Sequence, residues 1–301
     1  MRSWAVALLA VVFSISACEY VVVPPDEDAP AGATGQGWTA VVTAIAPAGD
    51  GGLRVELTIE NGTGAWSAMA AQGSATLRRA DGSTVPCPTV FVGTGGHRLG
   101  PGMRMRGYTG GTKAEPVTEL LRVECDASEA GTGATLELDY SYVSGEYNYY
   151  DPDAGRATGR LEVPLDPPAT DLTYPIAQPV DGLIQPADVE ITAINEVLLR
   201  LAGVERTGTT LEFTWEASNP GEYATFVHVG RPPVIGGDGI IYGWYESPDL
   251  ESVPAAPPGE KAEWTTVTPL PGGVGGLFIL LSVESKKQRL FVNYAIELGD
   301  V

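Results

Sequence analysis

The residues best suited to chemistry lie close together between positions 146 and 155. This segment carries three tyrosines, one amide side chain and three carboxylates: Tyr147, Tyr149, Tyr150, Asn148, Glu146, Asp151 and Asp153. Tyrosine combines a rigid apolar ring with a polar hydroxyl, so exposed tyrosines can stack on sugar rings or hold a protein partner. Alternatively, the rings cover the end of the folded domain. The sequence therefore predicts either a binding loop or a packing loop here.

The same segment offers oxygen ligands for calcium, which takes six to eight of them. Asp151 and Asp153 are spaced like the first two ligands of a calcium loop, and Glu162 stands at the twelfth position. Gly155 occupies the place of a third acidic ligand, and Arg156 that of the loop glycine. We keep Ca²⁺ bound by Asp151 and Asp153 as an alternative hypothesis.

A second aromatic loop contains Tyr242, Trp244 and Tyr245, followed by an acid and a proline. Its composition matches that of the first loop, so the two are expected to play similar roles. An intramolecular contact between domains would explain both loops equally well.

The two histidines do not predict a catalytic centre. His97 lies in a glycine-rich turn and His228 in an apparent strand, and neither has further ligands at the spacing of a zinc site. The turn around His97 lacks the Gly-Lys-Ser/Thr ending of a phosphate loop, and no Gly-x-Ser-x-Gly motif is present. We expect a protein that is not an enzyme; a hydrolase with an unrecognised pair of acids is the weakest alternative.

The start of the chain predicts export. Arg2 is the sole charge before an apolar run, and Glu19 closes that run well short of the roughly 20 residues that a membrane span needs. The motif Ile15-Ser16-Ala17-Cys18 resembles the lipobox of bacterial lipoproteins, whose cysteine is lipidated and becomes the new N-terminus. The resemblance implies a signal peptide over 1–17 and an acyl anchor such as palmitate on Cys18. Ordinary secretion and an uncleaved span are the alternatives.

Acyl chains would hold the protein at the extracytoplasmic face of the cell membrane or outer membrane, because each buried CH₂ contributes about 0.8 kcal/mol. The enterobacterial signal for retention at the inner membrane is an aspartate after the cysteine. Here that position is Glu19, so the choice of membrane stays open.

Two cysteines remain, Cys87 and Cys125, and only one intramolecular pairing is then available. Disulfides persist in oxidising compartments. We therefore predict a disulfide between them, which would stabilise the fold by about 4 kcal/mol in the chain-entropy model. Two free buried thiols are the alternative.

Charge and composition narrow the class of protein. The 301 residues carry a formal net charge of −20, which repels phosphate backbones, so we expect no nucleic-acid partner. The chain has 38 glycines and 24 prolines and no long helical pattern, which favours an all-β protein rich in turns.

The first domain is expected at 37–166, after an acidic Pro/Gly-rich tether at 18–36. Its clearest strand runs from Leu53 to Ile59, where aliphatic and polar residues alternate. Asp81-Gly82 predicts a hairpin turn, and prolines on both sides of Cys87 place that cysteine at a sheet edge or a bend. Seven to nine short strands suit an immunoglobulin-like sandwich.

A Pro-rich connector is expected at 167–186 and a second sandwich at 187–301. The connector also carries apolar residues, so we predict that it lies against one or both domains. Adding 158 superposes Leu53, Val55, Leu57, Ile59 and Asn61 on Leu211, Phe213, Trp215, Ala217 and Asn219. A short helix from Ile194 to Leu201 is the competing prediction at the start of this domain.

The first domain also resembles a known family. A strand ending in Asn61-Gly62, the turn at Asp81-Gly82, then Leu99-x-Pro101-Gly102 and an aromatic strand are similar to the immunoglobulin-like extracellular lipoprotein domains of unknown function. The resemblance, over Val41 to Tyr108, implies an immunoglobulin-like domain outside the cell. With the internal repeat, we expect an all-β chain with two tandem immunoglobulin-like β-sandwiches.

These expectations combine into one hypothesis about function. The chain is a non-enzymatic, lipid-anchored protein of the cell envelope with a binding or structural role. Its partner would be an envelope protein or a glycan. The alternative is a calcium-stabilised adhesion module that binds carbohydrate or protein.

Overall fold

The computed structural model describes residues 37–301 except for 72, 74, 112–115, 145–146, 149–154, 167, 170–171, 173, 175–182, 185–189, 193–196, 223–231, 244–256, 286–289 and 300. The predicted signal peptide, Cys18 and the tether lie outside these residues. In the described part, the regular elements are strands apart from one short 3₁₀ turn, η1 (Gly49–Gly51). No helix there is long and apolar enough to cross a membrane.

Sandwich 1 consists of two sheets, which we name after their central strands. The β2 sheet has the order β1-β2-β10-β6, with β7 also pairing β2. Its strands are β1 (Trp38–Pro47), β2 (Leu53–Asn61), β10 (Arg122–Cys125), β6 (Thr89–Phe91) and β7 (Arg104–Met105). The β11 sheet has the order β13-β11-β4-β5, with β3 also pairing β11. Its strands are β13 (Arg156–Pro164), β11 (Thr135–Ser144), β4 (Ala75–Arg78), β5 (Thr84–Cys87) and β3 (Ser67–Ala71).

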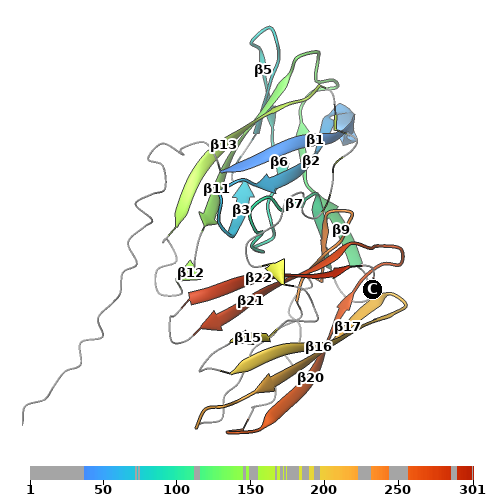
Figure 1. Ribbon diagram of the computed structural model, residues 1–301. Helices are drawn as coiled ribbons and strands as arrows, with labels where there is room; N and C mark the ends of the chain where they lie inside the picture. The colour runs from blue at the N-terminus through green and yellow to red at the C-terminus, as the bar shows by residue number, and fades with distance from the viewer. Residues whose placement is uncertain are drawn as a thin grey trace, which may run out of the picture. The chain divides into compact units, whose positions relative to one another are not determined.

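Sandwich 2 has the same plan. The β17 sheet contains β15 (Glu190–Thr192), β16 (Leu198–Thr207), β17 (Thr210–Ser218) and β20 (Lys261–Pro269), in that order (Figure 1). The β21 sheet has the core order β22-β21-β18-β19. Those strands are β22 (Leu290–Gly299), β21 (Leu277–Ser285), β18 (Val234–Ile235) and β19 (Ile240–Tyr242).

These strand orders are those of immunoglobulin-like domains. In sandwich 1 they correspond to A-B-E-D in one sheet and G-F-C-C′ in the other. In sandwich 2, β16-β17-β20 give A-B-E with β15 added beside β16, and β22-β21-β18-β19 give G-F-C-C′. The predicted fold class is confirmed. Leu198 begins a strand, so the competing helix does not extend over 198–201.

The similarity of the two sandwiches extends to their irregularities. The β1–β2 pairing shifts between Val42 and Ala44, opposite Leu57 and Glu56. The β16–β17 pairing shifts between Leu201 and Gly203, opposite Trp215 and Thr214, which are the residues 158 positions later. A bulge bends a strand, so β1 and β16 bend at equivalent positions opposite β2 and β17.

Buried asparagines mark the same point in both repeats. The Asn61 and Asn219 side chains each accept a backbone N–H two residues later, from Thr63 and Gly221, at 2.9 Å. Both asparagines are almost fully buried. The turn chemistry predicted for Asn61 is therefore a packed, repeated feature of the fold.

Specific links besides the core join the sheets of sandwich 1, among them a disulfide and a hydrogen bond. The predicted disulfide connects Cys87 in β5 with Cys125 in β10. β5 is the edge strand of its sheet, as the flanking prolines indicated. The Trp38 backbone N–H donates to the Tyr140 hydroxyl at 3.0 Å, which ties β1 to β11.

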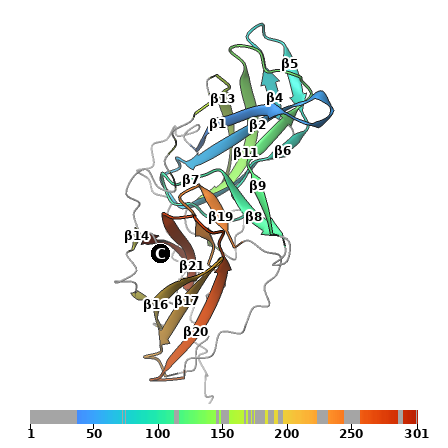
Figure 2. The ribbon, with the colours of Figure 1, turned by 90° about the vertical axis from the view of Figure 1, so that its right-hand side faces the viewer.

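The β21 sheet continues beyond sandwich 2. On the β19 side it gains β8 (Gly107–Gly111) and β9 (Pro116–Leu120), and on the β22 side β12 (Tyr147–Asn148) and β14 (Leu183–Ile184). Three of these four strands come from the predicted first domain. One sheet therefore crosses the boundary expected at 187, and Figure 2 shows β8 and β9 beside β19.

We predict that residues 37–301 unfold as one unit. Replacing Cys87 and Cys125 with alanine together removes the cross-link of sandwich 1 and should cost about 4 kcal/mol of unfolding free energy. Amide exchange should then show an equal loss of protection for Leu57 in sandwich 1 and Leu270 in sandwich 2. Wild-type protection retained at Leu270 would mean that the sandwiches unfold independently.

Candidate functional site

The predicted tyrosine loop contacts the second sandwich through its backbone. Tyr147 and Asn148 form β12 and pair with Phe291 and Leu290 of β22. This pairing is an intramolecular contact of the kind expected as the alternative to a binding loop. Tyr149, Tyr150, Asp151 and Asp153 lie outside the described residues, so the calcium hypothesis stays a prediction.

Tyr242 is not the exposed ligand contact that the sequence suggested. It lies in β19 and is 3 % exposed, and its hydroxyl donates to Asp238 Oδ2 at 2.5 Å. Burial, followed by the nearby carboxylate, raises its pKa above the ordinary value. Its side chain packs in the core of sandwich 2, and its backbone pairs with Val234 of β18. Trp244 and Tyr245 lie outside the described residues.

The two sandwiches meet at the β8–β9 hairpin, which extends from the β2 sheet. β7 and β10 pair with the two ends of β2, and between them the chain departs as the β8–β9 hairpin. At its base, the Leu121 N–H donates to the Arg106 carbonyl at 2.9 Å, and the Arg106 N–H donates to the Gly239 carbonyl at 2.8 Å. β8 then pairs in parallel with β19, Tyr108 opposite Ile241. We call this region, residues 104–111 and 116–122 with 235–241, the joint.

Apolar side chains close the joint because the β21 sheet is buried on both faces. Ile235, Ile241, Phe278 and Leu280 belong to the core of sandwich 1, whereas Ile279 and Leu281 belong to that of sandwich 2. Successive residues of β21 thus alternate between two cores. The continuous apolar run from 277 to 281 is the sequence signature of this arrangement.

The connector crosses the joint, as its apolar residues predicted. The Ala169 N–H donates to the Val42 carbonyl at 2.7 Å. Further along, the Tyr174 hydroxyl hydrogen-bonds to Thr58 Oγ1 on β2. The Tyr174 ring lies so close to Gly239 that a β-carbon there would clash with it. The connector therefore touches both sandwiches at the base of the hairpin.

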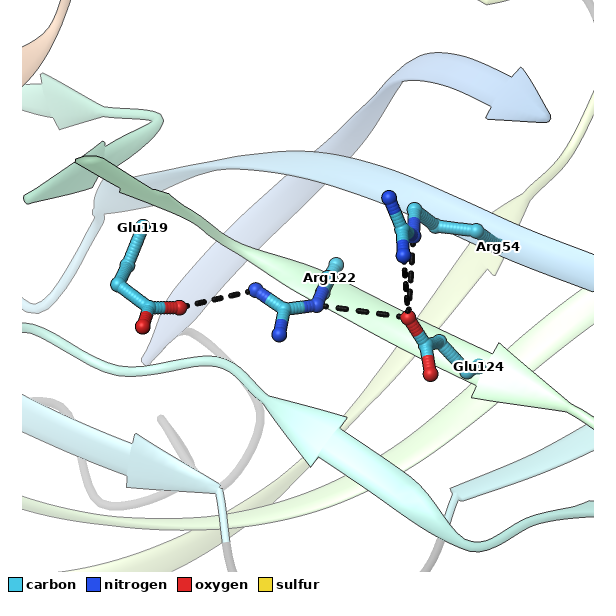
Figure 3. Close-up of polar contacts among 4 residues, drawn as sticks. All are labelled: Arg54, Glu119, Arg122 and Glu124. Atoms are coloured by element: carbon cyan, nitrogen blue, oxygen red, sulfur yellow. Dashed lines mark hydrogen bonds and ion pairs between the residues drawn. The ribbon is translucent and has the colours of Figure 1, made fainter. Parts of the chain in front are cut away.

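A row of alternating charges runs over the solvent-facing side of the β2 sheet beside the joint (Figure 3). Arg54 donates to Glu124 Oε1 at 3.0 Å, Arg122 Nε lies 3.5 Å from the same oxygen, and Arg122 Nη1 donates to Glu119 Oε2 at 3.0 Å. Glu119 belongs to β9 and Arg122 to β10. This pair therefore spans the point where the chain passes from one sheet to the other.

Aromatic rings lie against the same row. The Arg122 guanidinium carbon lies 5.2 Å from the centre of the Phe91 ring, which lies 5.1 Å from that of Tyr108. Burial raises the pKa of Tyr108 to about 12, and Glu119 adds to this while Arg122 opposes it. The phenol therefore stays neutral at ordinary pH and behaves as a packing group of the joint.

His97 lies in the turn that packs beside Tyr108. Both side chains lie within 4 Å of the position that a β-carbon on Gly95 would occupy. Within the described residues, His97 Nε2 is shielded from solvent and has no hydrogen-bond partner. Burial lowers the His97 pKa to about 4, so the imidazole is neutral at pH 7. His228 lies outside the described residues.

The solvent-facing side of the β17 sheet has a different charge pattern. Glu205 lies directly opposite Glu212, and Glu216 opposite Glu263. Arg200 and Lys261 each lie 3.7 Å from Glu216. Like charges opposite each other destabilise a sheet, so this face raises the acidity of the surface at some cost in stability.

The polar residues of the joint therefore help to hold the two sandwiches of this chain together. Among the described residues, no group of three or more histidine, cysteine or acidic side chains comes together as a metal centre. The sequence did not single out Arg122 and Glu119 as members of a joint, or Tyr174 and His97 as residues beside it. Their proximity depends on pairing between β8 and β19, which are more than 130 residues apart.

Comparison with known proteins gives little further information. No family model and no curated protein match the chain. A structure of the Salmonella enterica SafA pilin with the SafB chaperone aligns over 87% of this chain and 96% of its own, with 11% identity and a TM-score of 0.14. The E. coli chaperone DraB aligns over 86% of this chain and 100% of its own, with 12% identity and a TM-score of 0.15. Likenesses this low carry no argument about the present chain.

We predict that Arg122→Met lowers the free energy of unfolding by about 1 kcal/mol, since it removes two ion pairs and one cation–π contact. Urea unfolding at low and high salt measures the change, which should shrink as salt screens the ion pairs. Arg160→Met is the matched control, because the Arg160–Asp139 pair is exposed on both sides. An equal loss in both variants would show that the position beside the joint adds nothing.

Proposed function

We propose that the chain is a lipid-anchored protein of the extracytoplasmic cell envelope, with a non-enzymatic binding or structural role. The observation that carries the location is the Cys87–Cys125 disulfide, because such bonds persist in oxidising compartments. The motif Ile15-Ser16-Ala17-Cys18 independently supports export and lipidation.

The anchor would hold the protein through acyl chains, including palmitate, on Cys18. Two or three chains give firm attachment, since one chain alone binds a bilayer only marginally. A tether of 18 residues lies between Cys18 and Gly37, where the described body begins. At about 3.4 Å per extended residue, it would allow a reach of roughly 60 Å from the membrane surface.

A binding or structural role is supported by how the described body is built. Its two sandwiches share one sheet and a core, which favours a stiff support for loops at its surface. Tyr149, Tyr150, Trp244 and Tyr245 are the proposed contacts for an envelope protein or a glycan, because aromatic side chains recognise both.

Lipidation is tested on the mature protein. Mass spectrometry of protein produced in a bacterial host with a lipoprotein pathway should find an acylated Cys18 at the N-terminus. Cys18→Ser should abolish both the modification and the membrane association. An intact N-terminus at Met1, or membrane association that survives the substitution, would disprove the anchor.

The binding role is tested with residues 37–301 on a solid support. Envelope glycan and membrane-protein fractions should contain material that is retained by the wild type and lost, at least tenfold, with Tyr149→Ala/Tyr150→Ala. Val117→Ala is the control, because Val117 is an exposed apolar residue outside the aromatic loops. If the double substitution leaves retention unchanged, the tyrosine loop is not the contact.

A further inference from the structure

We propose that the outer edge of β20 is a docking site for an extended, positively charged segment of a partner protein, which adds to the β17 sheet as a further strand. The proposal rests on the binding role proposed above, but it uses a different surface from the aromatic loops. Among the described residues, β20 ends the strand order of the β17 sheet, whereas in sandwich 1 the corresponding strand β10 is followed by β6. The edge of a sheet that ends in this way offers a row of backbone groups to another chain.

The hydrogen bonds beside β20 show which of its backbone groups face outward. The Leu270 N–H, directly after the strand, donates to the Thr209 carbonyl at 2.8 Å, and the pairing with β17 continues along the whole of β20 without a register shift. Successive residues of an antiparallel strand direct their N–H and C=O groups alternately to its two sides. The backbone groups of Glu263, Thr265 and Val267 therefore point away from β17, toward the edge.

The middle of this edge lacks the features that usually protect one. Proline, bulges and charged side chains discourage the addition of a strand. In β20 the proline is the last residue, Pro269, and the regular pairing leaves no bulge. From Trp264 to Thr268 the residues are tryptophan, threonine and valine, which are uncharged and favour strands. Val267 is also one of the exposed large apolar side chains. This stretch is therefore suited to pairing with another strand.

Charge indicates the chemistry of the added segment. Glu263 is exposed and lies directly opposite Glu216 of β17. Arg200 and Lys261 each lie 3.7 Å from Glu216, whereas no ion pair within the described part of the chain involves Glu263. A lysine or arginine opposite Glu263 on an added strand would give this carboxylate a favourable cross-strand partner. The segment is therefore expected to carry a cation at that position and apolar side chains on the face of the partly buried Trp264.

A second copy of this chain fits the same edge less well. If two β20 strands paired antiparallel over most of their length, Glu263 would face a threonine or a valine of the other copy instead of a cation. The register that places Lys261 opposite Glu263 joins only the first residues of the two strands. Each copy also carries a net charge of −20, which opposes association.

Peptide binding to the mature protein tests the proposal. The probe is the labelled peptide Val-Thr-Val-Thr-Val-Lys-Val-Thr, which in antiparallel register places its lysine opposite Glu263. It should bind and protect the Glu263, Thr265 and Val267 amides from exchange, and glutamate in place of its lysine should weaken binding about fivefold. Glu263→Lys should reverse this preference. Glu162→Lys, on an exposed position of β13, is the matched control and should leave the preference unchanged.

Two further peptides test strand addition on the unchanged protein. An N-methyl group on the threonine opposite Thr265 removes an N–H that faces β20 and should abolish binding. The same group on the valine opposite Trp264, whose N–H faces away, should have little effect. Equal effects of the two groups would overturn the proposal.

Amide exchange without peptide provides the remaining check. Glu263, Thr265 and Val267 should exchange readily, and slow exchange would overturn the proposal because it would mean that the chain itself covers this edge. Protection that rises with protein concentration would also overturn it, since the occupant would then be a second copy. Tyr149→Ala/Tyr150→Ala should bind the peptide like the wild type, so failure of the edge is distinguishable from failure of the tyrosine loop.

Discussion

The burial of both faces of the β21 sheet is the constraint on which the rest of the structure depends. Ile235, Ile241, Phe278 and Leu280 point away from the core of sandwich 2, yet all four are at least 92 % buried. Burying a side chain of this size contributes roughly 2 kcal/mol. Left uncovered, the same side chains would form an exposed apolar patch of the kind that drives association. Packing against sandwich 1 removes this patch, and the hairpin and the connector are arranged around that contact.

Backbone pairing and electrostatics act together at the joint. β8 extends the sheet at β19, so an edge that would otherwise offer unpaired groups is covered within the chain. Beside it, the Glu119–Arg122 pair and the Phe91–Tyr108 contact fix the residues where the chain changes sheets. The chain has 38 acidic residues but only 18 basic ones, and several of its arginines, Arg54 and Arg122 among them, lie in or next to the joint. The opposed glutamates on the β17 sheet show that charges are less closely matched elsewhere.

Local sequence patterns predicted the two sandwiches, but not that the sandwiches share a sheet and a core. Alternation in 53–59, the Asp81-Gly82 turn and the prolines around Cys87 each act over a few residues, and the structure contains the elements they indicated. The 158-residue repeat was also visible, and it extends to the strand bulges. The aromatic composition of 242–245 did not show that the Tyr242 side chain is buried in the core of sandwich 2, where β19 pairs with β18. The apolar run at 277–281 indicated a sheet covered on both sides, but no local signal named sandwich 1 as the cover.

The shared sheet bears on how such a chain can be inherited. A domain that carries its own complete sheets and core can be moved between proteins as an independent unit. Here a gene break at the connector would leave one product without its outer strands β8 and β9, and the other without the β21 surface that covers its core. Because each half needs the other, recombination could move the two sandwiches only as a pair. The two halves are therefore expected to have diversified together, because a substitution on one side of their contact limits which residues the other side can accept.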